Sequence, residues 1–335
     1  MNVYSDESSL TINQQLERLQ REVSDISKMV FNNEQNFSSE NNPDFVKNLS
    51  AIDMRIYDLE KDVKNLTSNI EDLFFKIDLS NQKKLEKIFK KYNFLEVYNF
   101  AAQAGVGYSE QNPNAYTKSN IEGFINIIKL SKQNKVKKFF YASSSSVYGD
   151  CKKFPLKESE RLNPKNYYGI TKKTNEEIAR VFFDSFKFKS IGIRFFTVFG
   201  EWGRPDMFMI KYLNAVYNSK KFYLNNYGNH IRDFTYIDDV TNILIKLRTK
   251  KILGSEVYNI CSNNPIGLTN TINYFQKISP KIKILKRGFQ KSDIYKSHGD
   301  NRKILKLIKN YKFKNFFEAI KDMHNWFKLN KDLYK

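Results

Sequence analysis

The strongest constraint on the fold is a heptad pattern in the first 73 residues. Apolar side chains recur at alternating steps of three and four, which places them along one side of a helix that needs a partner helix. A polar stretch from Asn32 to Asp44 separates a short early seam from a longer later one. We predict a coiled coil over residues 1–73, with amphipathic helices lying on the following domain as the alternative. The longer seam consists of Leu49, Ile52, Ile56, Leu59, Val63, Leu66, Ile70 and Leu73.

The hydrophobic period changes at about Phe74. Short runs rich in β-branched and aromatic residues now alternate with helix-length stretches, notably 115–134 and 168–186. This alternation is typical of βαβ units in a doubly wound parallel sheet, whose binding sites lie beyond the carboxyl ends of the strands. We therefore predict an α/β domain over residues 74–335. The expected strands are FFKID, LEVYNF, KKFFYAS, SIGIRFF and VYNIC.

Charge and glycine divide the chain at the same place. Residues 1–78 carry 8 basic and 15 acidic side chains, although the whole chain has a net charge of +20, and all 13 glycines lie at or beyond Gly105. Only 11 of the 56 basic residues are arginines, so we attribute the excess to composition, solubility and attraction of anionic substrates. We do not expect a nucleic-acid partner.

Two cysteines, Cys151 and Cys261, are too few for a disulfide framework or a thiolate zinc site, and no metal site is expected. The N-terminus lacks the basic start and apolar core of a signal peptide, and no apolar stretch is long enough to span a bilayer. These features predict a cytoplasmic protein that does not enter a membrane.

The chemistry-bearing residues follow the strand KKFFYA. A serine cluster begins at Ser143, and Tyr168 and Lys172 lie some twenty residues further on, four positions apart. On a helix these two side chains share one face. A neighbouring ammonium favours the phenolate, so the pair can take a proton from a sugar hydroxyl. A Tyr-x-x-x-Lys spacing is common by chance, but its combination with a serine-rich strand end indicates function.

Several segments together resemble the extended short-chain dehydrogenase/reductase family, specifically its NAD-dependent nucleotide-sugar epimerases and dehydratases, and most closely the UDP-glucuronate 4-epimerases. The resemblance spans roughly residues 74–330, and the first segment faintly resembles the coiled coil of the Tol-Pal cell-division coordinator. The segments that carry the family resemblance are KIDLSNQKKLEKIF, FAAQAGVGYS, YASSSSVYG, YYGITKKTNE, IRFFTVFGEWGRPDM and RDFTYIDDV.

The resemblance implies roles for matching residues. Tyr168 would withdraw the proton from the 4-hydroxyl of a UDP-sugar, Lys172 would hold the nicotinamide ribose, and Ser144 would bond the reacting oxygen. Hydride would pass to NAD and return to the opposite face of the 4-keto sugar. Substrate-binding parts are expected around 200–232 and 263–330. The family also implies a homodimer packed through 115–134 and 168–186, to which the predicted coiled coil could add a further contact.

Neighbouring residues distinguish epimerisation from related reactions. Dehydratases and decarboxylases that resemble this family place acidic residues after the catalytic hydroxyl, whereas this chain has Ser145 and Ser146. By resemblance these serines and Thr197 would hold a uronate carboxylate in place. Arg204, Arg232 and Asp293 would bind the UDP-sugar, with surface salt bridges as the alternative for the two arginines.

The chain departs from the family at the cofactor site. Its glycine-rich turn, together with the first two strands and their helices, has no counterpart, so we expect an incomplete Rossmann-like sheet. The strand FFKID would slide beside EVYNF or join the preceding helix; alternatively that helix covers the gap, or the sheet stays open. Asn99 and Gly107 replace the usual His and Arg. The remaining cofactor-binding residues would be Asp78, Leu79, Ala101, Ala102, Gln103 and Lys172.

Three hypotheses follow. The chain is a UDP-glucuronate 4-epimerase with a rebuilt or borrowed cofactor site; or it is an inactive UDP-sugar-binding or scaffold protein; or it joins two unrelated gene fragments. The accepted sugar could be a glucuronate, a glucose or a hexosamine.

Overall fold

The structure is a computed structural model that describes residues 77–289 and 293–334. The chain divides into two units, Met1–Lys76 and Ile77–Lys335, and every described residue belongs to the second. The predicted coiled coil over residues 1–73 lies outside the described part.

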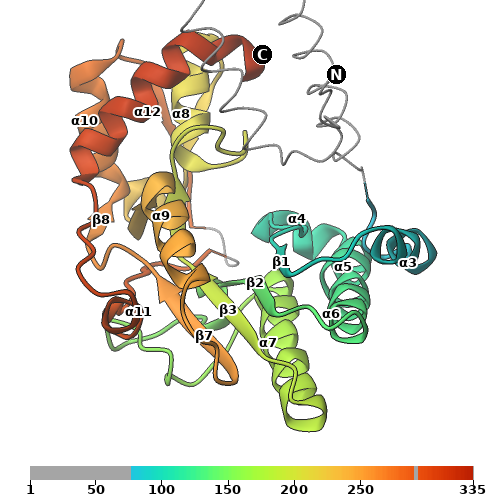
Figure 1. The fold of residues 1–335 in the computed structure, drawn as a ribbon. Coiled ribbons are helices and arrows are strands. Elements are labelled where there is room, and N and C mark those ends of the chain that lie inside the picture. Colours follow the sequence, from blue (N-terminus) through green and yellow to red (C-terminus); the bar gives the residue numbers. More distant parts are fainter. Residues whose placement is uncertain (1–76, 290–292, 335) are drawn as a thin grey trace, which may run out of the picture. The chain divides into compact units, whose positions relative to one another are not determined.

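A four-stranded parallel sheet forms the centre of the second unit (Figure 1). Its strand order is β1-β2-β3-β7, so β2 and β3 are its inner strands. Four of the predicted strands are thereby confirmed, each with shorter or shifted ends. The strands are β1 (Glu96–Asn99), β2 (Lys138–Ser144), β3 (Ser190–Phe195) and β7 (Ser255–Ile260).

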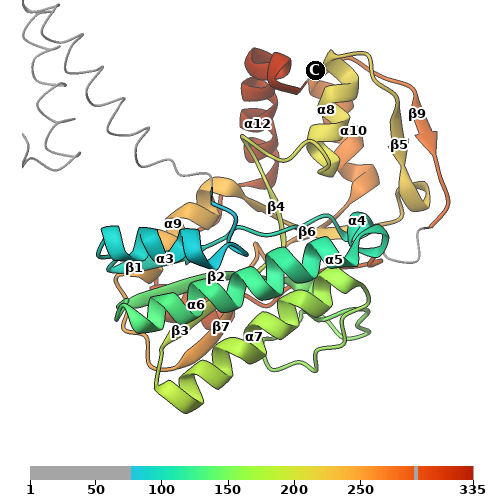
Figure 2. The same cartoon turned by 90° about the vertical axis from the view of Figure 1, so that its right-hand side faces the viewer.

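Helices cover both faces of this sheet, as expected of a doubly wound fold. On one face α3 (Gln82–Lys91), α6 (Gly123–Gln133) and α7 (Tyr167–Phe186) share a core with β1 and β2 (Figure 2). On the other face α9 (Ile237–Arg248) and α11 (Arg302–Ile308) pack against β3 and β7. The α/β expectation is confirmed for the described residues.

The remaining elements build a smaller part with its own aromatic-rich core. In Figure 1 the helices of this part lie at one end of the unit, away from the four-stranded sheet. They are α8 (Phe208–Tyr217), α10 (Leu268–Ile278) and α12 (Phe316–Asn330). Two small sheets accompany them: β4 (Thr197–Phe199), β6 (Ile231–Tyr236) and β8 (Pro265–Gly267), and β5 (Phe222–Leu224) with β9 (Ile284–Lys286). Short helical turns complete the unit: α4 (Val106–Gln111), η3 (Ser145–Val147), η4 (Asn225–Gly228) and η5 (Lys331–Tyr334).

Within the described residues β1 pairs only with β2 and forms the edge of the sheet. Tyr98 stacks on Phe140 of β2 with 4.7 Å between ring centroids, yet Tyr98 remains 39% exposed. The described end of the predicted strand FFKID corrects that expectation. Ile77 and Asp78 lie in no strand but precede a turn, and Ile77 packs its side chain against the core beside β1.

The two predicted helices are present with local differences. The stretch 115–134 divides into α5 (Pro113–Tyr116), a wider π-helical turn η2 (Thr117–Glu122) and α6. The second helix, α7, begins one residue early, at Tyr167, because the Asn166 side chain caps it by accepting a hydrogen bond from Gly169 N. This cap fixes the first turn of α7, which carries Tyr168.

Gly149, just after η3, allows a test of this local fold. Its φ is +68°, and a Cβ there would lie 1.8 Å from the carbonyl oxygen of Asn163. Gly149→Ala is expected to lower the free energy of unfolding by roughly 2–4 kcal/mol, through strain and this clash. Gly107→Ala is the control, since it meets no atom within 4 Å and a helical alanine is favourable. Equal stability of both variants in urea unfolding would contradict the described turn.

Candidate active site

The structure brings Ser144, Tyr168 and Lys172 together at the carboxyl end of β2. The Ser144 and Tyr168 side chains lie near enough to each other that hydrogen bonding from Ser144 acts to lower the pKa of Tyr168. The Lys172 Nζ lies 5.8 Å from the centroid of the Tyr168 ring and donates to the carbonyl oxygen of Ala142, 2.8 Å away. Lys172 is only 3% exposed. The helical spacing of four therefore places the phenol and the amine on one face of α7, directed at the serine-rich strand end.

Burial dominates the electrostatics of this cluster. It raises the pKa of Tyr168 above its ordinary value, while the hydrogen bond from Ser144 and the charge of Arg204 act in the opposite direction. Burial also lowers the pKa of Lys172 to about 8. The expected lowering of the Tyr168 pKa by Lys172 is thus wrong for the protein alone. The cation that opposes burial is Arg204, which comes from a segment the spacing argument did not connect to Tyr168.

Arg204 lies close to the phenol although it is distant in sequence. Its guanidinium forms a two-point ion pair with Asp206, with an Nη2–Oδ2 distance of 2.6 Å. The Tyr116 ring stands edge-on to that of Tyr168, at 6.4 Å between centroids. The salt-bridge alternative for Arg204 is therefore observed. The ion pair nevertheless lies beside Tyr168, and the side chains of Arg204 and Asp206 are each about half exposed.

The predicted carboxylate-holding residues gather at the ends of the two inner strands. Ser145 and Ser146 form the turn after β2, and the Ser146 N–H donates to Ser144 Oγ at 3.1 Å. Thr197 opens β4, two residues beyond Phe195, which is the register partner of Ser144. The segments that carry these hydroxyl groups thus follow neighbouring strands at the same edge of the sheet.

The other two predicted substrate residues, Arg232 and Asp293, form a separate group. Arg232 lies on β6, and Asp293 lies in the segment after β9. The Arg232 guanidinium donates to the carbonyl oxygens of Ile231 and Tyr295, at 3.0 and 3.1 Å. Burial lowers the pKa of Arg232, and the charge of Asp293 opposes this shift. His230 is 2% exposed and its Nε2 has no partner within the described residues. This group can meet a phosphate or ribose through Arg232.

The residues predicted to contact the cofactor lie in two segments, one just before α3 and one just after β1. Asp78 accepts hydrogen bonds from the Ser80 N–H and hydroxyl, which lower its pKa, and the carbonyl oxygen of Leu79 accepts from Asn126. Ala101, Ala102 and Gln103 follow the end of β1. The Gln103 backbone is held at both its N–H and its carbonyl by Asn120.

These residues fit only part of a dinucleotide. Lys172 is buried with a backbone carbonyl as its hydrogen-bond partner, which leaves it donors for a ribose. A pyrophosphate needs a row of backbone N–H groups at a glycine-rich helix start. The described residues contain no glycine before Gly105, and α3 begins after an Asn81 cap. The pyrophosphate-binding turn is therefore not among the described residues.

Asn120 was missed by the sequence reasoning. Its Nδ2 donates to Thr171 Oγ1 as well as to Gln103, so one side chain joins the end of β1 to α7. Asn120 lies in the π-helical turn η2, and such turns are frequent at functional sites. Asn120 stands among polar residues in the sequence TKSNIE, so nothing marked it out, and its partners are 17 and 51 residues away.

Two features are absent from the residues that the structure describes. The described residues hold no group of three or more His, Cys, Asp or Glu side chains that could bind a metal ion. No helix among them is both long and apolar enough to cross a bilayer.

The parallel sheet, the helices on both its faces and the serine–tyrosine–lysine cluster define a Rossmann-like fold of the extended short-chain dehydrogenase/reductase type. The profile of the NAD dependent epimerase/dehydratase family matches residues 32–261. This chain belongs to that family, which confirms the resemblance at family level. The match begins inside the segment for which a coiled coil is predicted.

Two relatives and one solved structure show which proteins this chain is similar to. The chain is 39% identical over 262 residues to an uncharacterised protein from Methanocaldococcus jannaschii, covering 77% of this chain and 80% of that protein. It is 35% identical over 267 residues to a UDP-glucuronate 4-epimerase from Thermodesulfobacterium geofontis, covering 78% and 81%. Among solved structures, UDP-glucuronic acid 4-epimerase from Bacillus cereus, in complex with UDP-glucuronic acid and NAD, has a TM-score of 0.71 at 27% identity, covering 80% of this chain and 87% of that one.

The lowered pKa of Lys172 has a measurable consequence. Unfolded, this lysine holds its proton up to about pH 10.5, but folded only to about pH 8. The unfolded state therefore binds more protons between these values, and stability due to this site rises with pH. Relative to Lys172→Met, the wild type should gain roughly 2–3 kcal/mol between pH 7.5 and pH 10 in urea unfolding. Lys129→Met, which removes an exposed lysine of α6, should show no such change; a flat difference for Lys172→Met would contradict its burial.

Proposed function

We propose that this chain is a UDP-sugar 4-epimerase that converts UDP-glucuronate to UDP-galacturonate. The observation that carries the proposal is the juxtaposition of Ser144, Tyr168 and Lys172, with Arg204 beside the phenol. The similarity to two UDP-glucuronate 4-epimerases, at 35% and 27% identity, supports the choice of reaction and sugar.

Tyr168 is the proposed base. Its phenolate oxygen would accept the proton of the sugar 4-hydroxyl, while Ser144 donates a hydrogen bond to the sugar oxygen. Because burial raises the pKa of Tyr168, the phenolate needs nearby positive charge, which Arg204 supplies. Lys172, with a pKa of about 8, is mostly protonated at neutral pH and would donate a hydrogen bond to the ribose when the cofactor is bound.

NAD, when bound, would accept hydride from C4 and return it to the other face of the flat 4-keto sugar. Lys172 would contact the nicotinamide ribose, and the rim of Asp78, Leu79 and the segment Ala101–Gln103 would meet the rest. The pyrophosphate contacts must come from outside the described residues, in a site rebuilt within the chain or completed by another polypeptide.

The hydroxyl groups of Ser145, Ser146 and Thr197 favour a uronate as substrate. Oxidation at C4 turns a uronic acid into a β-keto acid, which loses carbon dioxide when its carboxylate can rotate. Neutral donors at the ends of β2 and β3 would hold the carboxylate in the plane of the ring. No acidic residue occupies positions 143–148, so neither elimination of water nor decarboxylation has an added acid there.

The nucleotide would lie toward β6, near Arg232 and Asp293.

We also propose a homodimer packed through the helices predicted at 115–134 and 168–186, because they expose apolar side chains. These are Ile125, Ile170, Val181 and Phe186, each 41–52% exposed.

A second candidate function follows from the incomplete cofactor site of the described residues. The described residues lack a glycine-rich turn, which favours a protein that binds a UDP-sugar without turning it over. Both candidates share the nucleotide-binding residues, so binding alone does not separate them.

Turnover with added NAD separates the two. We expect the purified full chain to convert UDP-glucuronate to UDP-galacturonate in the presence of NAD, and to act on UDP-glucose at least about tenfold more slowly. Sugar analysis of the products and mass spectrometry of bound dinucleotide are the measurements. Absence of both turnover and bound dinucleotide at every NAD concentration would favour the binding protein. Equal rates on the two sugars would contradict the carboxylate argument.

Tyr168→Phe tests the proposed base. The change removes one oxygen, so turnover should fall roughly 10²–10⁴-fold, while affinity for UDP-glucuronate measured by calorimetry is retained. Tyr167→Phe is the matched control, because the Tyr167 hydroxyl bonds Thr117 instead. Retention of wild-type turnover by Tyr168→Phe would remove the base from the mechanism.

A further inference from the structure

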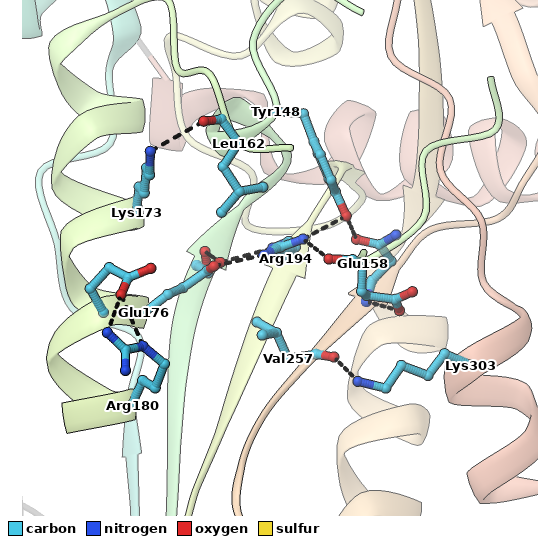
Figure 3. A network of polar contacts seen from close by, with 12 residues as sticks. Tyr148, Glu158, Leu162, Lys173, Glu176, Arg180, Arg194, Val257 and Lys303 are labelled. Carbon is cyan, nitrogen blue, oxygen red and sulfur yellow. Dashed lines mark hydrogen bonds and ion pairs between the residues drawn. The ribbon is translucent and has the colours of Figure 1, made fainter. Parts of the chain in front are cut away.

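A buried ion pair lies beneath the candidate site and takes no direct part in it. Arg194 of β3 and Glu176 of α7 are 3% and 7% exposed. The guanidinium binds the carboxylate at two points, Nη2–Oε2 at 2.7 Å and Nε–Oε1 at 2.9 Å (Figure 3). Such a planar two-point contact fixes orientation as well as distance.

The pair is the centre of a larger polar network. Ser143 Oγ donates to Glu176 Oε1 at 2.5 Å, which ties β2 to the carboxylate. Arg194 Nη1 donates to the Tyr148 hydroxyl at 2.9 Å and to the carbonyl oxygen of Glu158 at 3.1 Å. The Tyr148 hydroxyl in turn donates to Asn259 of β7, at 2.7 Å. Figure 3 shows this chain of contacts running from α7 across the sheet to β7.

Every element that carries the proposed base cluster meets this network. Glu176 lies four residues beyond Lys172 and eight beyond Tyr168, so all three share one face of α7. Ser143 directly precedes Ser144, and Arg194 is its register partner on β3. The same strand leads to Thr197. The network therefore joins α7 to the strand ends at the level of the site.

Stability alone does not account for a pair of this kind. Removing two charges from water is expensive, and a buried ion pair is often no more stabilising than apolar residues of similar size. An apolar contact would hold α7 on the sheet but would allow small rotations and shifts. A two-point ion pair allows few, and a misplacement of about 1 Å at a reacting group can lower a rate by about 10²-fold.

We propose that Glu176 and Arg194 are positioning residues that set the distance between the Ser144 and Tyr168 hydroxyls. The proposal rests on the proposed function for its kinetic consequence only. The pair acts through geometry: it holds the register between α7 and β2, and Ser143 transmits that register to its neighbour.

Three variants test the proposal at different points. Arg194→Lys keeps the charge and loses the fork; Ser143→Ala keeps the ion pair and releases β2 from it. The double variant Glu176→Leu with Arg194→Met removes both charges together, so no unpaired charge stays buried. Arg180→Lys is the matched control on the same helix, because Arg180 forms its ion pairs with Glu177 and Asp184 on the exposed side.

In the holoenzyme we expect kcat to fall about 10- to 100-fold in the three variants, with the KM for UDP-glucuronate within about threefold of wild type. Arg180→Lys should keep wild-type kcat. Unchanged kcat in Ser143→Ala, which leaves the buried charges paired, would overturn the proposal, as would a change confined to KM.

Crystal structures of the wild type and Ser143→Ala give a readout that needs no activity. We expect the distance between the Ser144 and Tyr168 hydroxyl oxygens to be about 1 Å longer in the variant than in the wild type. An unchanged distance would overturn the positioning role even if the protein is an epimerase. If the distance increases in the variant but the wild type shows no turnover, the proposed function is rejected and the positioning role stands.

Discussion

The packing of α7 against the inner strands β2 and β3 is the constraint on which the rest of the described structure depends. Phe139 and Tyr141 of β2 share a core with α6 and α7, and the buried Arg194–Glu176 pair ties the same helix to β3. Because the side chains of one helical face repeat every three or four residues, anchoring α7 here also directs Tyr168 and Lys172 toward the end of β2. The site is thus a consequence of how one helix is seated.

Burying a phenol and an amine together has an electrostatic consequence. Burial favours the neutral form of both, raising the pKa of Tyr168 and lowering that of Lys172 to about 8. At Tyr168 the protein opposes this shift with the charge of Arg204, which comes from the segment after β4. The charge of Arg204 is in turn balanced by Asp206. The reactive pair therefore depends on the smaller part of the unit as well as on the sheet.

The cofactor side of the site follows from the edge of the sheet. In the described residues β1 has a neighbour on one side only, and Asn120 holds the segment after it against α7. This segment is well placed to line a ligand, but a pyrophosphate needs backbone donors that the described residues do not present. Substrate binding and cofactor binding are accordingly supported to different degrees by the same fold.

The sequence alone determined the α/β class, four strands, both long helices and the shared face of Tyr168 and Lys172, because periodicity and spacing are local properties. It misplaced a strand over Ile77 and Asp78, and it paired Tyr168 with the charge of Lys172 rather than that of Arg204. It also passed over Asn120, Glu176 and Arg194, whose roles depend on partners far along the chain. Only the tertiary structure decided these points, since burial and the distance between two charges are set by packing between segments and leave no periodic trace in the sequence.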